Sequence, residues 1–169
     1  MKKKGKIIVT SMLKEHWKDV SRIYKLGIET GISTFEKEVP GWSKWDASHL
    51  KDCRWIALSS GKVTGWAALS KVSDRCCYKG VAEVSIYVDP SFNHQGIGSL
   101  LLERLILSSE TKGIWTLQAG IFSENIPSIN LHRKFGLRLV GIREKLGKIN
   151  DQWKDIILME RRSKRVGIE

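Results

Sequence analysis

Residues 91–100 read SFNHQGIGSL and join a strand-like run to a helix-like run. The two glycines, Gly96 and Gly98, lie between a β-branched run that ends in Asp89-Pro90 and an apolar run with helical spacing. A glycine-rich connection from a strand to a helix is typical of phosphate-binding loops, because main-chain N–H groups and the positive end of a helix attract anions. The neighbouring residues decide which phosphate compound fits.

Two familiar phosphate loops do not fit. A Walker loop ends in Gly-Lys-Ser/Thr, whereas here Gly98 is followed directly by Ser99. A dinucleotide fingerprint needs a third glycine where Leu101 stands. The remaining pattern is a strand, a proline and a Q/R-x-x-G-x-G/A loop before a helix, the arrangement that holds the pyrophosphate of an acyl-CoA. Gly-x-Gly alone is also an ordinary strand-to-helix connection, so further motifs are needed.

The run before the loop, residues 81–88, alternates as a β-strand does. One face is apolar and the other carries an acid, a hydroxyl and a phenol: Val84, Ile86 and Val88 against Glu83, Ser85 and Tyr87. The polar face is either a solvent-facing side of a sheet or one wall of a site, and the pattern leaves both open.

Periodicity along the rest of the chain predicts an α+β fold with a mixed, mostly antiparallel central sheet flanked by helices. We expect residues 1–169 to form a single domain with basic tails at about 1–5 and 162–169. Ser43 is the predicted N-cap of the second helix. The expected strands are 6–10, 54–58, 63–69, 81–88, 114–121, 137–144 and 153–161, and the expected helices are 16–29, 43–52, 97–110 and 127–136.

Charge and cysteine content limit the possible partners. The 29 Lys and Arg against 18 Asp and Glu give a formal charge of +11, much of it at the ends. Charged ends are more often solvated than bound to nucleic acid, so we expect no nucleic-acid partner. No run approaches the ~20 apolar residues of a membrane helix. The three cysteines match neither a disulfide nor a metal-ligand pattern, which predicts no metal and a reduced, cytoplasmic protein.

Two motifs together resemble the central motifs of the GNAT superfamily of N-acetyltransferases. They are residues 88–101 and the pattern Asn125-x-x-Ser128-x-x-Leu131-His132-x-x-x-Gly136. Further short matches are similar to the phosphinothricin and methionine sulfoximine acetyltransferase branch, and they lie at residues 33–36, 65–67, 75–78, 83–88, 131–132 and 153–155. One departure is Asn93, where the family usually has Gln or Arg; its shorter side chain weakens any side-chain contact to the pyrophosphate.

This resemblance implies a GNAT fold and the transfer of an acetyl group from acetyl-CoA to the primary amine of a phosphinothricin-like or methionine-sulfoximine-like acceptor. It implies a homodimer, and Arg75 with Tyr78 as the clamp for the acceptor carboxylate. The implied acetyl-CoA residues are Ile86, Tyr87, Val88, His94, Gln95, Gly96, Ile97, Gly98, Ser99, Asn125 and Ser128, and the implied acceptor residues are Phe35, Glu36, Arg75, Tyr78 and Ser85.

Glu83 and His132 are the catalytic residues that the resemblance implies. Glu83 would take the proton of the acceptor ammonium, directly or through water; the alternative is a structural carboxylate paired with Arg75 or Arg143. His132 stands where many superfamily members carry a Tyr acting as general acid toward the CoA sulfur; the alternative is a histidine packed against the sheet.

Two other functions stay open. Acetylation of a protein N-terminus or lysine would need an open groove in place of an Arg-lined pocket. A CoA-binding regulatory protein or a nucleic-acid-binding protein would use the basic tails as its contact surface.

Overall fold

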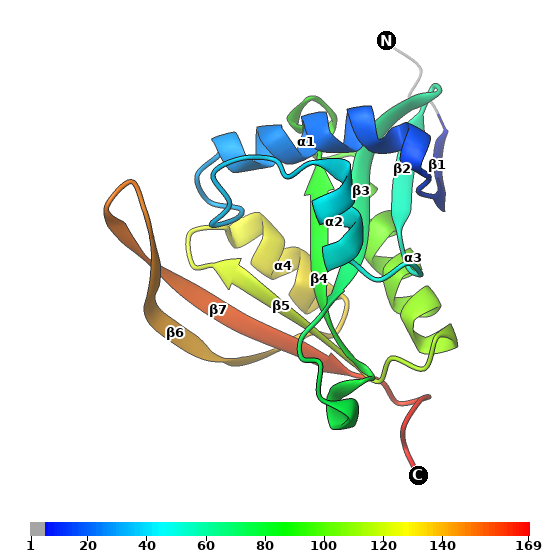
Figure 1. Cartoon of the computed structure of the whole chain (residues 1–169), viewed down its shortest axis with the longest axis vertical. Helices are drawn as coiled ribbons and strands as arrows, with labels where there is room; N and C mark the ends of the chain where they lie inside the picture. The colour runs from blue at the N-terminus through cyan, green and yellow to red at the C-terminus, as the bar shows by residue number, and fades with distance from the viewer. Residues whose placement is uncertain (1–5) are drawn as a thin grey trace.

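The computed structural model describes residues 6–169, so the expected basic tail at residues 1–5 lies outside it. One sheet holds seven strands in the order β1-β2-β3-β4-β5-β7-β6, with helices on both faces (Figure 1). The strands are β1 Ile7–Ser11, β2 Trp55–Ser59, β3 Lys62–Lys71, β4 Val81–Val88, β5 Thr116–Phe122, β6 Arg138–Ile149 and β7 Gln152–Arg162. The helices are α1 Trp17–Glu29, α2 Trp42–Ser48, α3 Ile97–Thr111 and α4 Ile126–Lys134. The predicted α+β class and element order are confirmed.

The pairing of β4 with β5 sets up the site. It is the single parallel pair of this sheet, and its register runs only from Val81↔Thr116 to Glu83↔Gln118. Beyond Glu83 the two strands separate, although β4 stays paired with β3 as far as Val88. Main-chain groups along the separated edges therefore have no sheet partner on that side, and they face the space between the strands.

Two apolar layers hold the sheet from opposite faces. Leu101 and Leu105 of α3 are fully buried against β2, β3 and β4. On the other face Ile23 of α1 and Trp45 of α2 are fully buried with Trp66 of β3. Helix α4 covers β5 and β7 with a smaller cluster around Ile129, Ile121 and Met159. Strands β2 to β4 are thus covered on both faces, whereas β6 and β7 extend beyond them as a long hairpin (Figure 1).

Two local predictions need correction. Helix α2 begins at Trp42 with Gly41 as its N-cap, so the N-cap prediction for Ser43 is wrong. The closing strands are longer than predicted, because β6 continues to Ile149 and the tight turn lies at Asn150 and Asp151, both with positive φ. A β-bulge after Arg143 interrupts the alternation there, so the sequence pattern stopped short of the observed strand end.

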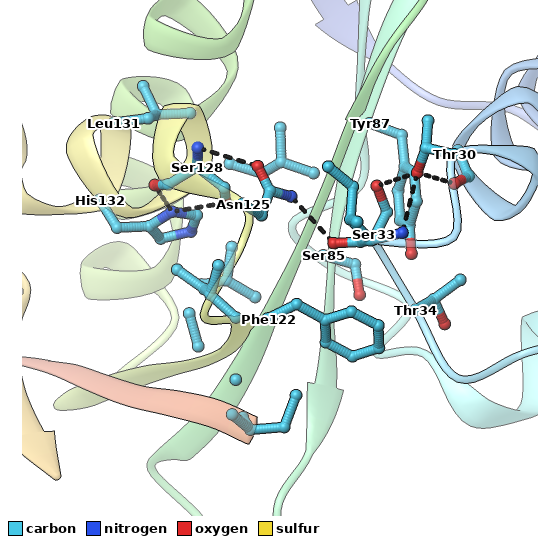
Figure 2. Close-up of a pocket in the computed structure, with 18 of the residues that line it drawn as sticks. Thr30, Ser33, Thr34, Ser85, Tyr87, Phe122, Asn125, Ser128, Leu131 and His132 are labelled. Atoms are coloured by element: carbon cyan, nitrogen blue, oxygen red, sulfur yellow. Dashed lines mark hydrogen bonds between the residues drawn. The ribbon is translucent and has the colours of Figure 1, made fainter. Parts of the chain in front are cut away.

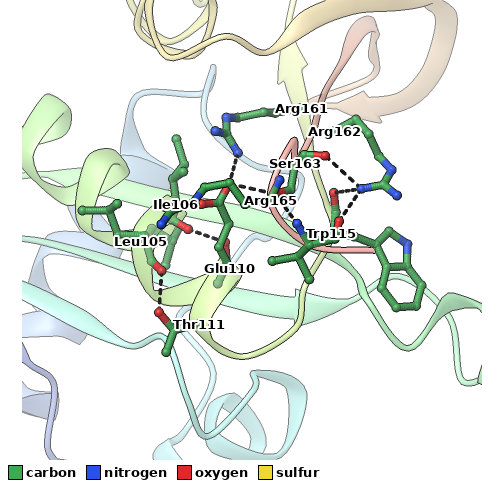
Figure 3. A network of polar contacts seen from close by, with 12 residues as sticks. Leu105, Ile106, Glu110, Thr111, Trp115, Arg161, Arg162, Ser163 and Arg165 are labelled. Carbon is green, nitrogen blue, oxygen red and sulfur yellow. Dashed lines mark hydrogen bonds and ion pairs between the residues drawn. The ribbon is translucent and has the colours of Figure 1, made fainter. Parts of the chain in front are cut away.

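The chain after β7 is fixed against the end of α3 (Figure 3). The carboxylate of Glu110 accepts hydrogen bonds from Arg161 Nη1 at 2.9 Å and from the Ser163 hydroxyl at 2.9 Å, and Arg165 lies 3.7 Å away. Ser163 is buried. Burial alone would raise the pKa of Glu110, but the Arg161 and Ser163 hydrogen bonds outweigh it and lower the pKa. The basic residues at this end are therefore partly engaged within the fold.

Candidate active site

A cleft of about 580 Å³ opens where β4 and β5 stop pairing. This volume suits a small-molecule site. Its walls come from the separated strands, from the loop after α1, from α4 and from the β6–β7 hairpin. Residues that line it include 84–88, 119–122, 32–36, Asn93, Asn125, Ser128, Leu131, His132, Arg143, Ile156 and Leu158.

The glycine loop leads into α3 beside this cleft. Gly96 is the N-cap of α3 in the left-handed conformation, with φ of 79°, which a residue without Cβ adopts at no steric cost. The helix that follows has 15 residues, and its first N–H groups carry the positive end of the helix dipole. Asn93 lines the cleft, whereas residues 94–99 lie on the adjoining loop and helix start. This geometry can hold an anion through the main chain.

An ion pair anchors the beginning of that loop. Asp89 follows β4 and is buried, and its Oδ2 lies 2.7 Å from Nη1 of Arg22 on α1. Its Oδ1 accepts the Ser91 N–H at 2.9 Å. Burial alone would raise the pKa of Asp89, but the bonds from Arg22 and Ser91 outweigh it and lower the pKa. Sequence reasoning missed this anchor, because Arg22 is 67 residues away along the chain.

Asn125 joins α4 to the loop after α1 (Figure 2). Its Oδ1 accepts the Ser128 N–H at 3.2 Å as the helix N-cap, and its Nδ2 donates to the Ile32 carbonyl at 3.3 Å. Both Asn125 and Ser128 line the cleft. The side chain of Asn125 therefore fixes two walls of the site relative to each other.

His132 of α4 lines the cleft and is buried, with one ring nitrogen unpaired. Its Nδ1 lies 2.8 Å from the Ser128 carbonyl oxygen, which can only accept, so Nδ1 carries the proton. Nε2 then presents a lone pair and has no partner among the described residues. Burial lowers the pKa of His132, although the Ser128 contact opposes it. The neutral ring therefore favours proton acceptance at Nε2 over the expected general-acid role, which needs the doubly protonated form.

Glu83 lines the cleft from β4 and is held by a neutral neighbour. Gln118 on β5 donates from Nε2 to Glu83 Oε2 at 2.7 Å. Within residues 6–169 no ion pair joins Glu83 to Arg75 or Arg143. The Glu83 side chain thus has no cationic partner among residues 6–169, and Gln118 orients it.

The predicted acceptor residues divide into two groups. Phe35, Glu36 and Ser85 line the cleft, and the Phe35 ring packs 4.7 Å from the ring of Phe122. A Cβ on Gly147 of β6 would come 2.7 Å from the Phe35 ring, so this glycine permits the close packing.

Arg75 and Tyr78 lie elsewhere. Arg75 is the N-cap of the short 3-10 segment Cys76–Tyr78 between β3 and β4, and Tyr78 is its last residue. Both are exposed and outside the cleft lining. The Arg75 guanidinium lies 5.8 Å from the centre of the Tyr78 ring. The cleft has its own arginine, Arg143, which sequence reasoning considered only as a partner of Glu83. Its local sequence carries no signal for a site.

The predicted acetyl-CoA residues lie in two places. Ile86, Tyr87 and Val88 line the cleft with Asn125 and Ser128. Desolvation by burial raises the pKa of Tyr87, so its phenol stays protonated as a hydrogen-bond donor. His94, Gln95, Gly96, Ile97, Gly98 and Ser99 form the adjoining loop and first turn of α3.

The chain belongs to the acetyltransferase (GNAT) family, whose model matches residues 13–137. The phosphinothricin N-acetyltransferase of Alcaligenes faecalis is 30% identical to it, over 84% of this chain and 75% of that protein. The L-methionine sulfoximine/L-methionine sulfone acetyltransferase of Salmonella typhimurium is 30% identical, over 62% of this chain and 61% of that protein. The N-acetyltransferase from Staphylococcus aureus Mu50, a crystal structure, is 28% identical with a TM-score of 0.84, over 94% of this chain and 99% of that chain.

These matches confirm the predicted resemblance and the GNAT fold. The chain spans about three fifths of the length of several curated relatives, 59% to 63%.

Among the described helices, none is long and apolar enough to cross a membrane. Residues 6–169 contain no cluster of three or more His, Cys, Asp or Glu placed to hold a metal ion.

Proposed function

We propose that this protein transfers the acetyl group of acetyl-CoA to the primary amine of a small amino-acid-like acceptor of the phosphinothricin or methionine sulfoximine type. The observation that carries the proposal is the cleft between the separated strands β4 and β5, with the glycine loop at one side and Glu83 on its wall. The names of the relatives from A. faecalis and S. typhimurium support the same class of acceptor.

The main chain would hold acetyl-CoA. The N–H groups of residues 94–99 suit its pyrophosphate, because they combine a left-handed cap with the positive end of α3. The β5-facing edge of β4 has no ladder partner beyond Glu83, which leaves main-chain groups at residues 86–88 for the pantetheine arm. An N–H near Val88 would polarise the thioester carbonyl.

Side chains on the cleft walls would handle the protons. An alkyl ammonium must lose a proton before it can attack, and Glu83, oriented by Gln118, is placed to accept it directly or through water. His132 lines the same cleft, and its buried Nε2 carries a lone pair without a partner among the described residues. Phe35, Glu36 and Ser85 would contact the acceptor.

The test is thiol release from acetyl-CoA with a panel of phosphinothricin, methionine sulfoximine, other free amino acids, polyamines, aminoglycosides and peptides. We expect turnover with the amino acids and little with peptides, because Asn125 ties the loop after α1 to α4 and leaves a site of small-molecule size. Faster turnover with peptides would support a protein acetyltransferase instead. CoA binding without turnover of any amine would refute the enzymatic proposal.

A homodimer and a cytoplasmic location complete the proposal. The β6–β7 hairpin exposes large apolar side chains on a chain that is otherwise rich in charge: Leu139, Val140, Ile142, Leu146 and Trp153. A second copy of the same hairpin would cover them. Sedimentation of the wild type against Ile142→Asp tests the dimer.

Three free cysteines agree with a compartment that keeps thiols reduced.

A further inference from the structure

The charged side chains that line the cleft are unequally distributed around it. Glu83 comes from β4, whereas the single lining arginine, Arg143, comes from β6, which is separated from β4 by β5 and β7 in the sheet order. Glu36 comes from the loop after α1, where the neighbouring Phe35 packs against Gly147 of β6. No ion pair between residues 6 and 169 involves Arg143. The Glu83 carboxylate and the Arg143 guanidinium thus come from two well-separated strands of the cleft wall.

The sheet register directs Arg143 into the cleft. Ile156 on β7 is the cross-strand partner of both Phe122 and Arg143, and partners in register share one face of a sheet. Phe122 and Ile156 both line the cleft. Arg143 therefore ends a cross-strand row whose other members form the cleft wall.

A β-bulge fixes this position. Between the pairs Arg143↔Ile156 and Gly147↔Lys154, residues 144–146 of β6 lie opposite the single residue Asp155 of β7. Lys145 has φ of 46°, and its N–H donates to Asp155 Oδ1 at 2.7 Å, so a side chain of β7 holds the bulge. Bulges of this kind redirect neighbouring side chains and are common beside active sites.

We infer that Arg143 binds an oxyanion of the acceptor while the acceptor amine lies on the Glu83 side. A planar guanidinium is suited to bidentate contact with a carboxylate or phosphinate oxygen pair. An amino-acid acceptor offers two sources of this chemistry, its α-carboxylate and an anionic group on its side chain. The inference rests on the proposed function and adds to it the residue that selects a dipolar acceptor over a simple amine.

The test compares wild type, Arg143→Gln and Arg143→Lys with three acceptors. Phosphinothricin carries both anions, its α-carboxamide keeps only the phosphinate, and methionine keeps only the α-carboxylate. For Arg143→Gln we expect kcat/KM with phosphinothricin to fall about 10- to 100-fold with an unchanged KM for acetyl-CoA, and Arg143→Lys to recover part of it. The acceptor that becomes insensitive to the substitution lacks the anion that Arg143 binds.

Arg138→Gln is the matched control, because Arg138 lies on the same strand, is exposed, and pairs with Glu160 outside the cleft lining. Equal losses for all three acceptors, or no loss, would overturn the inference while leaving the acetyltransferase proposal intact. Calorimetric binding of phosphinothricin to the CoA complex distinguishes a failure of the Arg143 inference from a failure of the acetyltransferase proposal. Weaker binding by Arg143→Gln supports the inference even if no acetyl transfer occurs, and equal binding by variant and wild type overturns it.

Discussion

Strands β2 to β4 carry helices on both faces, whereas the β6–β7 hairpin projects beyond them with most of β6 exposed (Figure 1). The enclosed half holds the aromatic core around Trp45 and Trp66, and the hairpin holds exposed apolar and charged side chains. The cleft lies at the junction and takes Glu83 from the enclosed half and Arg143 from the hairpin. The helix-covered half therefore carries the proposed proton acceptor on a packed strand, whereas the hairpin carries the proposed contacts to the acceptor anion and to a second copy.

The largest expected effect is on catalysis, at Glu83 in the enclosed half. Glu83→Gln should lower kcat/KM by about 100- to 10,000-fold, because the amide cannot accept the acceptor's proton. The same substitution keeps the size of the side chain, so the thermal midpoint should stay near that of wild type. Glu144→Gln, on the exposed hairpin strand, is the control. A normal rate in Glu83→Gln would remove the base assignment.

The next effect is on stability, and it compares two tryptophans. Trp45 is fully buried, and its replacement by Ala should lower the free energy of unfolding by about 3–5 kcal/mol. Trp153 on the hairpin is 54% exposed, and Trp153→Ala should change it by about 0.5 kcal/mol or less in the monomer. Denaturant unfolding at low protein concentration measures both. Similar losses would mean that the hairpin is as tightly packed as the enclosed half.

A smaller effect should appear at the Arg22–Asp89 ion pair. Arg22→Met leaves the buried Asp89 carboxylate with the Ser91 N–H as its remaining partner, and should cost about 1–3 kcal/mol. Because Asp89 begins the glycine loop, the KM for acetyl-CoA should rise several-fold while the KM for the acceptor stays constant. Lys25→Met on the same helix, an exposed lysine, is the control. A rise in the KM for the acceptor as well as in the KM for acetyl-CoA would count against a role of Asp89 that is specific to the glycine loop.

The smallest effect is the pH dependence of stability. The pKa values of Asp89 and Glu110 are lowered in the fold by their arginine partners, so both groups stabilise the protein above their unfolded pKa. That contribution should disappear as the pH falls from about 4 through the lower folded values. Thermal midpoints between pH 7 and pH 3 measure it, and Glu110→Gln should give a flatter curve. If Glu110→Gln left the slope of the thermal midpoint against pH unchanged, Glu110 would contribute nothing to the pH dependence of stability.

The local sequence predicted most elements because each depends on neighbouring residues. The alternation of residues 81–88 matched β4, and the glycine spacing matched the start of α3 at Ile97. The ends of the β6–β7 hairpin were missed because a bulge and a positive-φ turn there interrupt the alternation. The same bulge explains why the sequence did not predict Arg143 as a residue of the cleft, because Arg143 lies directly beside it.

The sequence by itself determined the glycine loop, the polar face of β4 and the family resemblance, since these patterns are read within short stretches. Three features depend on the folded arrangement instead: Gln118 orients Glu83, His132 donates at Nδ1, and Arg143 shares a cleft with Glu83. The physical reason is the strand order β4-β5-β7-β6, in which β7 lies between β5 and β6. Residues far apart in the chain meet there through cross-strand register, which local periodicity does not encode.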